Sequence, residues 1–173
     1  MIILSTSEFL VECMSDKPPH HSRENGGHIQ IVPKYKCSHR YELPLDLAAR
    51  LTYMTMLVGE ATTIALQKNG IDIIRINYQN NGNWAYKVSG KFPQLHEHLY
   101  FRTAHEKHPD NDPRFQAFPE ALTFPDRATG YYDKFMPYTQ QECDSIYTEI
   151  VRLSNNDKYK DLDLLLELED KMK

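Results

Sequence analysis

Hydrophobic and polar positions alternate in several short segments of the chain, and this pattern predicts strands. The apolar run FLVEC within Ser7–Met14 is rich in β-forming residues, and HIQIV at His28–Val32 alternates before it ends at Pro33. The polar stretch SDKPPHHSRENGG between these two segments contains proline and glycine, so it predicts a long loop. Two further strands are predicted at Ile71–Asn77 and around Leu95–Thr103.

A repeat of three to four positions predicts one long helix and a shorter one near the end of the chain. The long helix is expected over Pro44–Asn69, because a proline suits the first helical turn. Near the end, Thr139 and Glu142 form a capping box that predicts a helix start, and a final helix is expected over Lys158–Lys173. The core-facing stripe of the long helix consists of Leu47, Leu51, Met54, Val58, Ala61 and Ala65.

The predicted order of elements is β-β-α-β-β, which places a helix inside a run of antiparallel strands. This order indicates an α+β fold and argues against a doubly wound one. The pair Asn81-Gly82 predicts a turn between the last two strands. We expect a core over 1–105, and a wrapping loop and two helices over 106–173, all within one domain.

Composition and charge narrow the classes of function. Lys plus Arg is 20 and Asp plus Glu is 24, and the resulting net charge of −4 argues against a protein that coats nucleic acid. Mean hydropathy is −0.61 and no apolar run approaches the roughly 20 residues that cross a bilayer, so no membrane association is expected. The start lacks a basic segment, which predicts no signal peptide. Three widely spaced cysteines suit reduced thiols in a cytoplasmic protein: Cys13, Cys37 and Cys143.

The main candidate chemistry lies in the stretch FPQLHEHLYFR. Gln94, His96 and His98 occupy every second position, so in a strand they would share one face, with neighbours about 7 Å apart. The two leucines of the stretch would face the core on the other side. Glu97 would lie on that second face too, where a carboxylate needs a partner, so we expect this face to be only partly covered there.

Three interpretations of the two histidines follow from the residues alone. The pair could be hydrogen-bonded or exposed without any chemistry. It could form half of a metal site, with further ligands from His105, His108 or the His20-His21 pair. Alternatively, one imidazole could attack a substrate while its neighbours orient it.

Two separated motifs favour the third interpretation, because together they resemble the histidine triad superfamily of nucleotide hydrolases and transferases. GGHIQIVPK, Gly26–Lys34, is similar to a family strand that begins with Gly-His and ends with Val/Ile-Pro-Lys before a long helix. FPQLHEHLYFR is similar to the motif strand of a bacterial diadenosine-polyphosphate-hydrolase-like subgroup, Pro-His-Leu-His-x-His-Leu-x-x-Arg. The resemblance covers roughly Phe9–Arg102. The positions that match in register are Pro93, Leu95, His96, His98, Leu99 and Arg102.

The chain departs from the family pattern at three positions. Gln94 takes the first triad position, Glu97 replaces an apolar residue, and Lys36 stands where a histidine is common. A register shifted by two residues would make His98 the attacking residue and place Tyr100 third. We disfavour that register because the proline, leucine and arginine matches are then lost.

The resemblance implies a covalent mechanism. His96 would attack the α-phosphorus of a nucleotide and form a nucleotidyl-histidine, from which water releases the nucleoside monophosphate. An ordinary imidazole is mostly neutral at pH 7, so no metal cofactor is required, and Mg²⁺ bound to the substrate phosphates is left open. His98 would contact phosphate or the bridging oxygen, and Gln94 would donate an N–H to phosphate or orient His96. His28 would be a partner from the neighbouring strand, or else a structural histidine.

The resemblance also implies where the substrate binds. Asn77 would contact ribose or phosphate, with a plain turn residue as the alternative, and Ser89, Gly90 and Lys91 would surround phosphates. We expect a homodimer that hydrolyses a dinucleoside polyphosphate or a nucleoside phosphoramidate. Two alternatives are a nucleotide-binding module without turnover and a metal-dependent hydrolase that uses His96 and His98.

Overall fold

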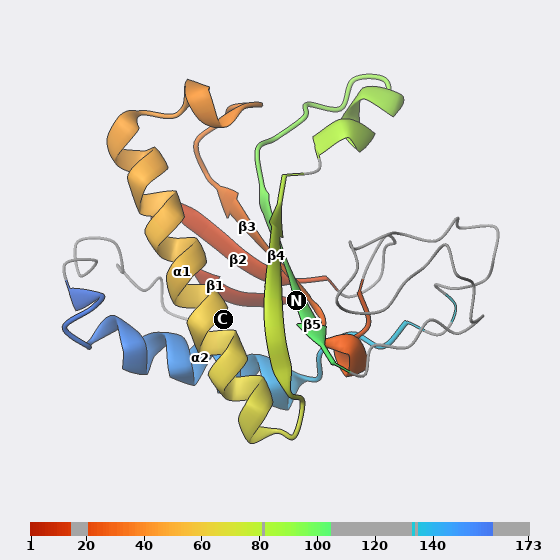
Figure 1. Cartoon of the computed structure of the whole chain (residues 1–173). Coiled ribbons are helices and arrows are strands. Elements are labelled where there is room, and N and C mark those ends of the chain that lie inside the picture. The colour runs from red at the N-terminus through yellow and green to blue at the C-terminus, as the bar shows by residue number, and fades with distance from the viewer. Residues whose placement is uncertain (15–20, 81, 105–132, 134, 161–173) are drawn as a thin grey trace.

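A five-stranded antiparallel sheet forms the centre of the molecule (Figure 1). The computed structural model describes residues 1–14, 21–80, 82–104, 133 and 135–160. The strands lie in the order β1-β2-β3-β5-β4, which confirms the predicted α+β class. Their bounds are β1 (Ile2–Ser5), β2 (Phe9–Cys13), β3 (His28–Pro33), β4 (Ile73–Gln79) and β5 (Glu97–Thr103).

The strand β1 was not predicted from the sequence. Its four residues, IILS, are too few to show a period of two, and β1 gains its stability by pairing with β2. The described order is therefore β-β-β-α-β-β, with one strand more than expected.

The helix α1 (Leu45–Lys68) lies across one face of the sheet, as its apolar stripe predicted (Figure 1). Leu51, Met54 and Val58 are almost fully buried in the core. A Cβ on Gly59 would lie 2.9 Å from the Tyr78 hydroxyl, so glycine allows the helix to approach β4 closely. The predicted bounds, Pro44–Asn69, differ from the observed ones by one residue at each end.

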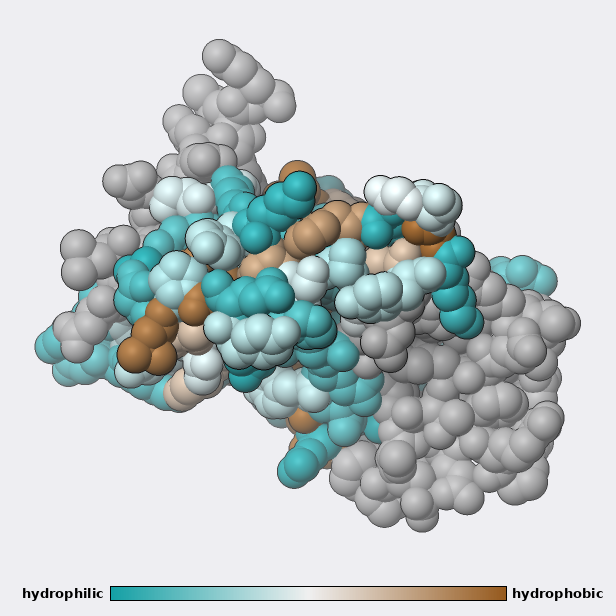
Figure 2. Space-filling view, turned by 90° about the horizontal axis from the view of Figure 1, so that it is seen from above, coloured by the Kyte–Doolittle hydropathy of each residue, from teal (hydrophilic) through white to brown (hydrophobic). Residues whose placement is uncertain are grey.

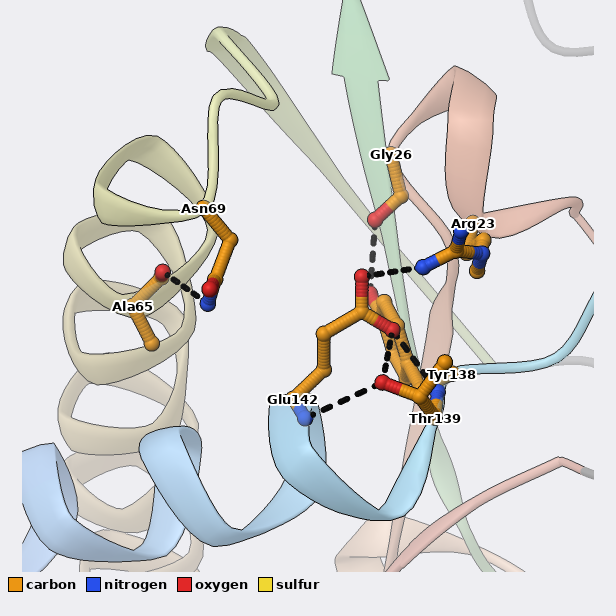
Figure 3. Close-up of polar contacts among 7 residues, drawn as sticks. All are labelled: Arg23, Gly26, Ala65, Asn69, Tyr138, Thr139 and Glu142. Carbon is orange, nitrogen blue, oxygen red and sulfur yellow. Dashed lines mark hydrogen bonds and ion pairs between the residues drawn. The ribbon is translucent and has the colours of Figure 1, made fainter.

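The helix α2 (Gln140–Ser154) packs against α1 and covers the lower end of the sheet in Figure 1. The predicted capping box is present, because Thr139 Oγ1 accepts from the Glu142 amide and the Glu142 carboxylate accepts from Thr139. The same carboxylate pairs with Arg23 at 2.6 Å, and the Tyr138 hydroxyl donates to the Gly26 carbonyl at 2.6 Å (Figure 3). These contacts attach the start of α2 to the short 3-10 helix η1 (Arg23–Asn25) before β3.

The connection between β4 and β5 differs from the tight turn that Asn81-Gly82 predicted. A 3-10 helix, η3 (Gly82–Lys87), and an extended segment follow β4, and β5 begins only at Glu97. Asn81 itself lies outside the described residues, as do most of the predicted wrapping loop and residues 161–173 of the predicted final helix. Within the described ranges, no helix combines the length and apolar character that crossing a membrane needs.

Candidate active site

The polar and aromatic side chains of the β5 motif lie on the face of the sheet opposite α1. Alternation along β5 places His98, Tyr100 and Arg102 on this face, whereas Leu99 points to α1 near Gly59. Strand pairing then brings further polar residues beside them. In the antiparallel registers, the residues opposite these positions are His28 and Gln30 on β3, and Asn77 and Gln79 on β4.

His96 lies immediately before β5, and one nitrogen of its ring is held by the backbone. The Nδ1 atom is 2.7 Å from the carbonyl oxygen of Gln94. A carbonyl can only accept a hydrogen bond, so Nδ1 carries the proton and Nε2 keeps its lone pair in the neutral ring. The residue is partly exposed, so this nitrogen belongs to a ring that solvent and ligands can reach.

His98 is buried and forms a tight pair with His28. The distance between His98 Nδ1 and His28 Nε2 is 2.7 Å, which joins two residues 70 positions apart in the chain. The His96 and His98 rings meet edge to face, with centroids 4.5 Å apart. The Tyr100 ring stacks against both His28 and His98, with centroid distances of 4.2 Å and 5.5 Å. The four rings therefore form one cluster on the side of β3 and β5 opposite α1, where His28, His98 and Tyr100 are buried.

Gln94 does not align with the histidines on one strand face, contrary to the sequence-based prediction. It lies in the extended segment before β5, and its side-chain amide donates to the carbonyls of Pro33 at 3.1 Å and Tyr35 at 2.8 Å. The amide thereby ties this segment to the end of β3. Its backbone carbonyl holds His96, so the described contacts let Gln94 position His96 through the main chain.

The predicted substrate-binding residues lie in two places. Asn77 is on β4 beside Tyr100, and its side-chain oxygen accepts from the guanidinium of the buried Arg102 at 3.1 Å. It is thus part of a strand, not a plain turn residue. The predicted phosphate-binding residues Ser89, Gly90 and Lys91 are exposed on the connection that leads into β5.

Glu97 lies on the α1 side of β5, as predicted, and has an ion pair there. Its carboxylate is buried and contacts the Arg40 guanidinium. Glu97 also borders a surface cavity of about 560 Å³. The other lining residues are Ser38, His39, Arg40, Tyr41 and Asn80. Figure 2 shows the molecule from this end, where hydrophilic side chains predominate in the described part and a few hydrophobic ones appear between them.

The described ranges offer no third ligand that would complete a metal site with His96 and His98. No three His, Cys, Asp or Glu side chains there are arranged to hold a metal ion. Of the further ligands considered from the sequence, His21 contacts the Asn25 carbonyl at 2.9 Å. The remaining three, His20, His105 and His108, lie outside the described residues.

Several solved structures of histidine triad proteins have a fold similar to that of this chain. No family model and no curated protein sequence matches the chain. A histidine triad protein from Marinobacter aquaeolei VT8 is 18% identical with a TM-score of 0.55, covering 88% of this chain and 87% of that one. A histidine triad protein from Sinorhizobium meliloti 1021 is 22% identical with a TM-score of 0.53, over the same shares. A hypothetical histidine triad nucleotide-binding protein from Sulfolobus tokodaii strain 7 is 21% identical with a TM-score of 0.51, covering 88% and 85%. The chain therefore has the histidine triad fold.

Proposed function

We propose that this protein hydrolyses a nucleotide through a covalent nucleotidyl-histidine on His96. The single observation that carries the proposal is the hydrogen bond from His96 Nδ1 to the Gln94 carbonyl. It leaves the lone pair on Nε2, and the ring is partly exposed on the side of the sheet opposite α1. A neutral imidazole nitrogen in this state is a competent nucleophile for phosphorus.

The reaction would proceed in two displacements. Nε2 of His96 attacks the α-phosphorus, the bond to the leaving group breaks, and a phosphorus–nitrogen bond forms. Water then attacks the same phosphorus, the phosphorus–nitrogen bond breaks, and a nucleoside monophosphate leaves. The substrate class would be a dinucleoside polyphosphate or a nucleoside phosphoramidate. No step requires a metal from the protein, and Mg²⁺ would act only on the substrate phosphates.

His98 would donate a proton or hydrogen bond to the phosphate or leaving-group oxygen. This role needs the proton on its Nε2 atom, and therefore a lone pair on Nδ1. His28 provides for this arrangement when its Nε2–H donates to His98 Nδ1 across the 2.7 Å contact. In this proposal His28 acts as a positioning residue that selects the tautomer of His98.

The phosphates would be bound by groups near the start of β5. Ser89 and Lys91 are exposed there and offer a hydroxyl and a positive charge, while Gly90, at φ +77°, allows the chain to turn closely. Asn77 would reach ribose or phosphate from β4, with its side-chain oxygen held by Arg102.

Turnover of a diadenosine polyphosphate, measured as release of AMP, tests the proposal. His96→Ala is expected to lower kcat on the order of 10⁴-fold while the far-UV circular dichroism stays unchanged. His39→Ala is the matched control, because His39 is an exposed histidine of the Glu97 cavity and lies outside the proposed machinery. Quenched reactions should contain protein whose mass is greater by one nucleotidyl group, and this adduct should be absent in His96→Ala.

The same assay separates the two alternatives. A module that only binds nucleotide would bind AMP but would not cleave the dinucleotide, so no AMP would be produced. A metal-dependent hydrolase would lose activity after dialysis against a strong chelator and regain it with the metal. Full activity in His96→Ala would exclude the covalent mechanism.

We further propose that the protein forms a homodimer through α1 and the edge strand β4. Tyr53 and Met56 of α1 are 50% and 42% exposed, and Ile74 and Tyr78 of β4 are 42% and 53% exposed. Tyr78 lies on the α1 side of the sheet, next to Gly59, and among the described strands β4 pairs with β5 alone. Exposed apolar side chains beside an open strand edge favour association with a second copy.

A further inference from the structure

We propose that Cys13 and Cys143 form a site of reversible oxidation, at which hydrogen peroxide joins β2 to α2 through a disulfide. The two sulfur atoms lie 3.3 Å apart although the residues are 130 positions apart in the chain. A disulfide has a sulfur–sulfur distance of about 2.05 Å. The thiols therefore need to approach by about 1.3 Å, which small side-chain rotations can supply.

The surroundings of the pair give its two thiols different chemistry. The hydrogen bond from the Cys143 thiol lowers the pKa of Cys13 to about 7, against the opposing effect of burial. The same contact and burial raise the pKa of Cys143. A thiolate is the nucleophile in peroxide reactions, so Cys13 is the residue that reacts first and Cys143 is the residue that closes the bond.

The third cysteine shows what an ordinary buried thiol looks like in the same protein. Cys37 is 2% exposed, close to the 1% of Cys13 and Cys143, but burial raises its pKa. Its position in the connection after β3 is far in sequence from both other cysteines. It therefore serves as an internal reference in every experiment on the pair.

The proposed reaction consumes one peroxide for two thiols. The Cys13 thiolate attacks one peroxide oxygen, the oxygen–oxygen bond breaks, and hydroxide leaves as water after it takes up a proton. Cys13 is then a sulfenic acid. The Cys143 sulfur attacks the Cys13 sulfur, the sulfur–oxygen bond breaks, and a second water leaves with the thiol proton. Both sulfurs are oxidised and the peroxide is reduced to two waters.

The position of the pair gives the disulfide a structural consequence. Cys143 is the residue after Glu142, and it lies five positions after Tyr138. Glu142 pairs with Arg23, and the Tyr138 hydroxyl donates to the Gly26 carbonyl (Figure 3). A covalent bond to β2 would secure this first turn of α2 on the sheet. Both thiols are 1% exposed, so the reaction requires a local opening that admits peroxide, a molecule little larger than water.

The test uses the full chain, reduced and then treated with hydrogen peroxide. After denaturation and alkylation with iodoacetamide, the oxidised protein should carry one label, and the same protein reduced with dithiothreitol before alkylation should carry three. Peptide mapping should identify the Cys13–Cys143 cross-link. The melting temperature should rise by several degrees on oxidation and return on reduction.

Three variants complete the test. Cys37→Ser should still form the cross-link, whereas Cys13→Ser and Cys143→Ser should not form it. Three labels after peroxide, a cross-link that involves Cys37, or oxidation of Cys13 to sulfinic acid without a disulfide would each overturn the proposal. The peptide map of the unmutated protein decides the question even where a serine variant folds poorly, and it does not depend on hydrolase activity.

Discussion

The chemistry of the site depends on which nitrogen of each imidazole carries the proton. For His96 a backbone carbonyl decides this, because it can only accept a hydrogen bond. For His98 the partner is another imidazole, which can either donate or accept at the same contact, so the tautomer of His28 sets that of His98. The two histidines of one short motif therefore have different hydrogen-bond partners, which suits the different roles proposed for them.

Replacing His28 tests whether it positions His98. His28→Ala removes the hydrogen bond at His98 Nδ1, so we expect kcat for AMP release to fall about 10- to 100-fold with KM nearly unchanged. His28→Gln offers an amide N–H near the position of the imidazole Nε2–H and should recover part of the loss. Steady-state kinetics of the three proteins check this. Equal activity in all three would remove the positioning role.

Gln94 illustrates a role that its place in the motif does not reveal. Gln94→Ala removes two hydrogen bonds to the carbonyls of Pro33 and Tyr35, so it should lower the free energy of unfolding by about 1–2 kcal/mol. It should also lower kcat, because the segment that holds His96 loosens. Urea denaturation and kinetics measure both effects. Gln94→Glu should resemble alanine, since a carboxylate cannot donate to a carbonyl.

A different result would assign Gln94 another role. If its amide binds substrate phosphate instead, KM would rise in Gln94→Ala while the unfolding midpoint in urea stays the same.

At the scale of elements, close backbone contacts set the position of β3 relative to β5. Gly26 ends η1 at φ +118°, and a Cβ there would lie 2.0 Å from the Phe101 carbonyl oxygen of β5. Both atoms of this contact are fixed by backbone geometry, so neither can rotate away. His28, the first residue of β3, follows two positions after Gly26, so this junction also determines where the His28 ring meets His98.

Alanine at Gly26 should therefore be far more damaging than alanine at an unobstructed glycine. We expect Gly26→Ala to lower the free energy of unfolding by about 3 kcal/mol or more. Gly70→Ala is the matched control: its φ is +80°, but a Cβ there meets no atom within 4 Å, so about 1–2 kcal/mol is expected. Urea unfolding of both variants checks the difference. Similar losses in the two would show that Gly26 is required only for its backbone angle.

At the scale of the whole molecule, the exposed apolar residues of α1 and β4 lead to a prediction about mass in solution. Ile74→Lys and Met56→Lys should shift the protein from dimer to monomer, because each places a charge in the proposed interface. Leu45→Lys is the control, since Leu45 is 88% exposed at the start of α1, outside the proposed patch. Size-exclusion chromatography with light scattering measures the result. A monomeric unmutated protein would contradict the proposal.

The sequence predicts the elements well wherever the hydrophobic period is long enough to read. α1 spans 24 residues with an apolar stripe, and its ends were predicted to within one residue. β1 was missed because four residues carry no readable period, and the connection into β5 was mistaken for a tight turn. The start of β5 was also placed too early, because Leu95 continues the apolar alternation although Gln94 and His96 lie outside the strand.

The order of α1, α2 and the strands β2 to β5, the core faces and the spacing of His28, His96 and His98 follow from the sequence alone. Periodicity determines which face of each element is buried, and the motif determines which residue types occur near one another in the chain. Only the tertiary structure decides which side chains from distant segments meet. The His28–His98 bond, the binding of Gln94 to the end of β3 and the meeting of Cys13 with Cys143 all depend on strand register and helix placement. Local patterns carry no information about these, because register and packing arise from the whole core at once.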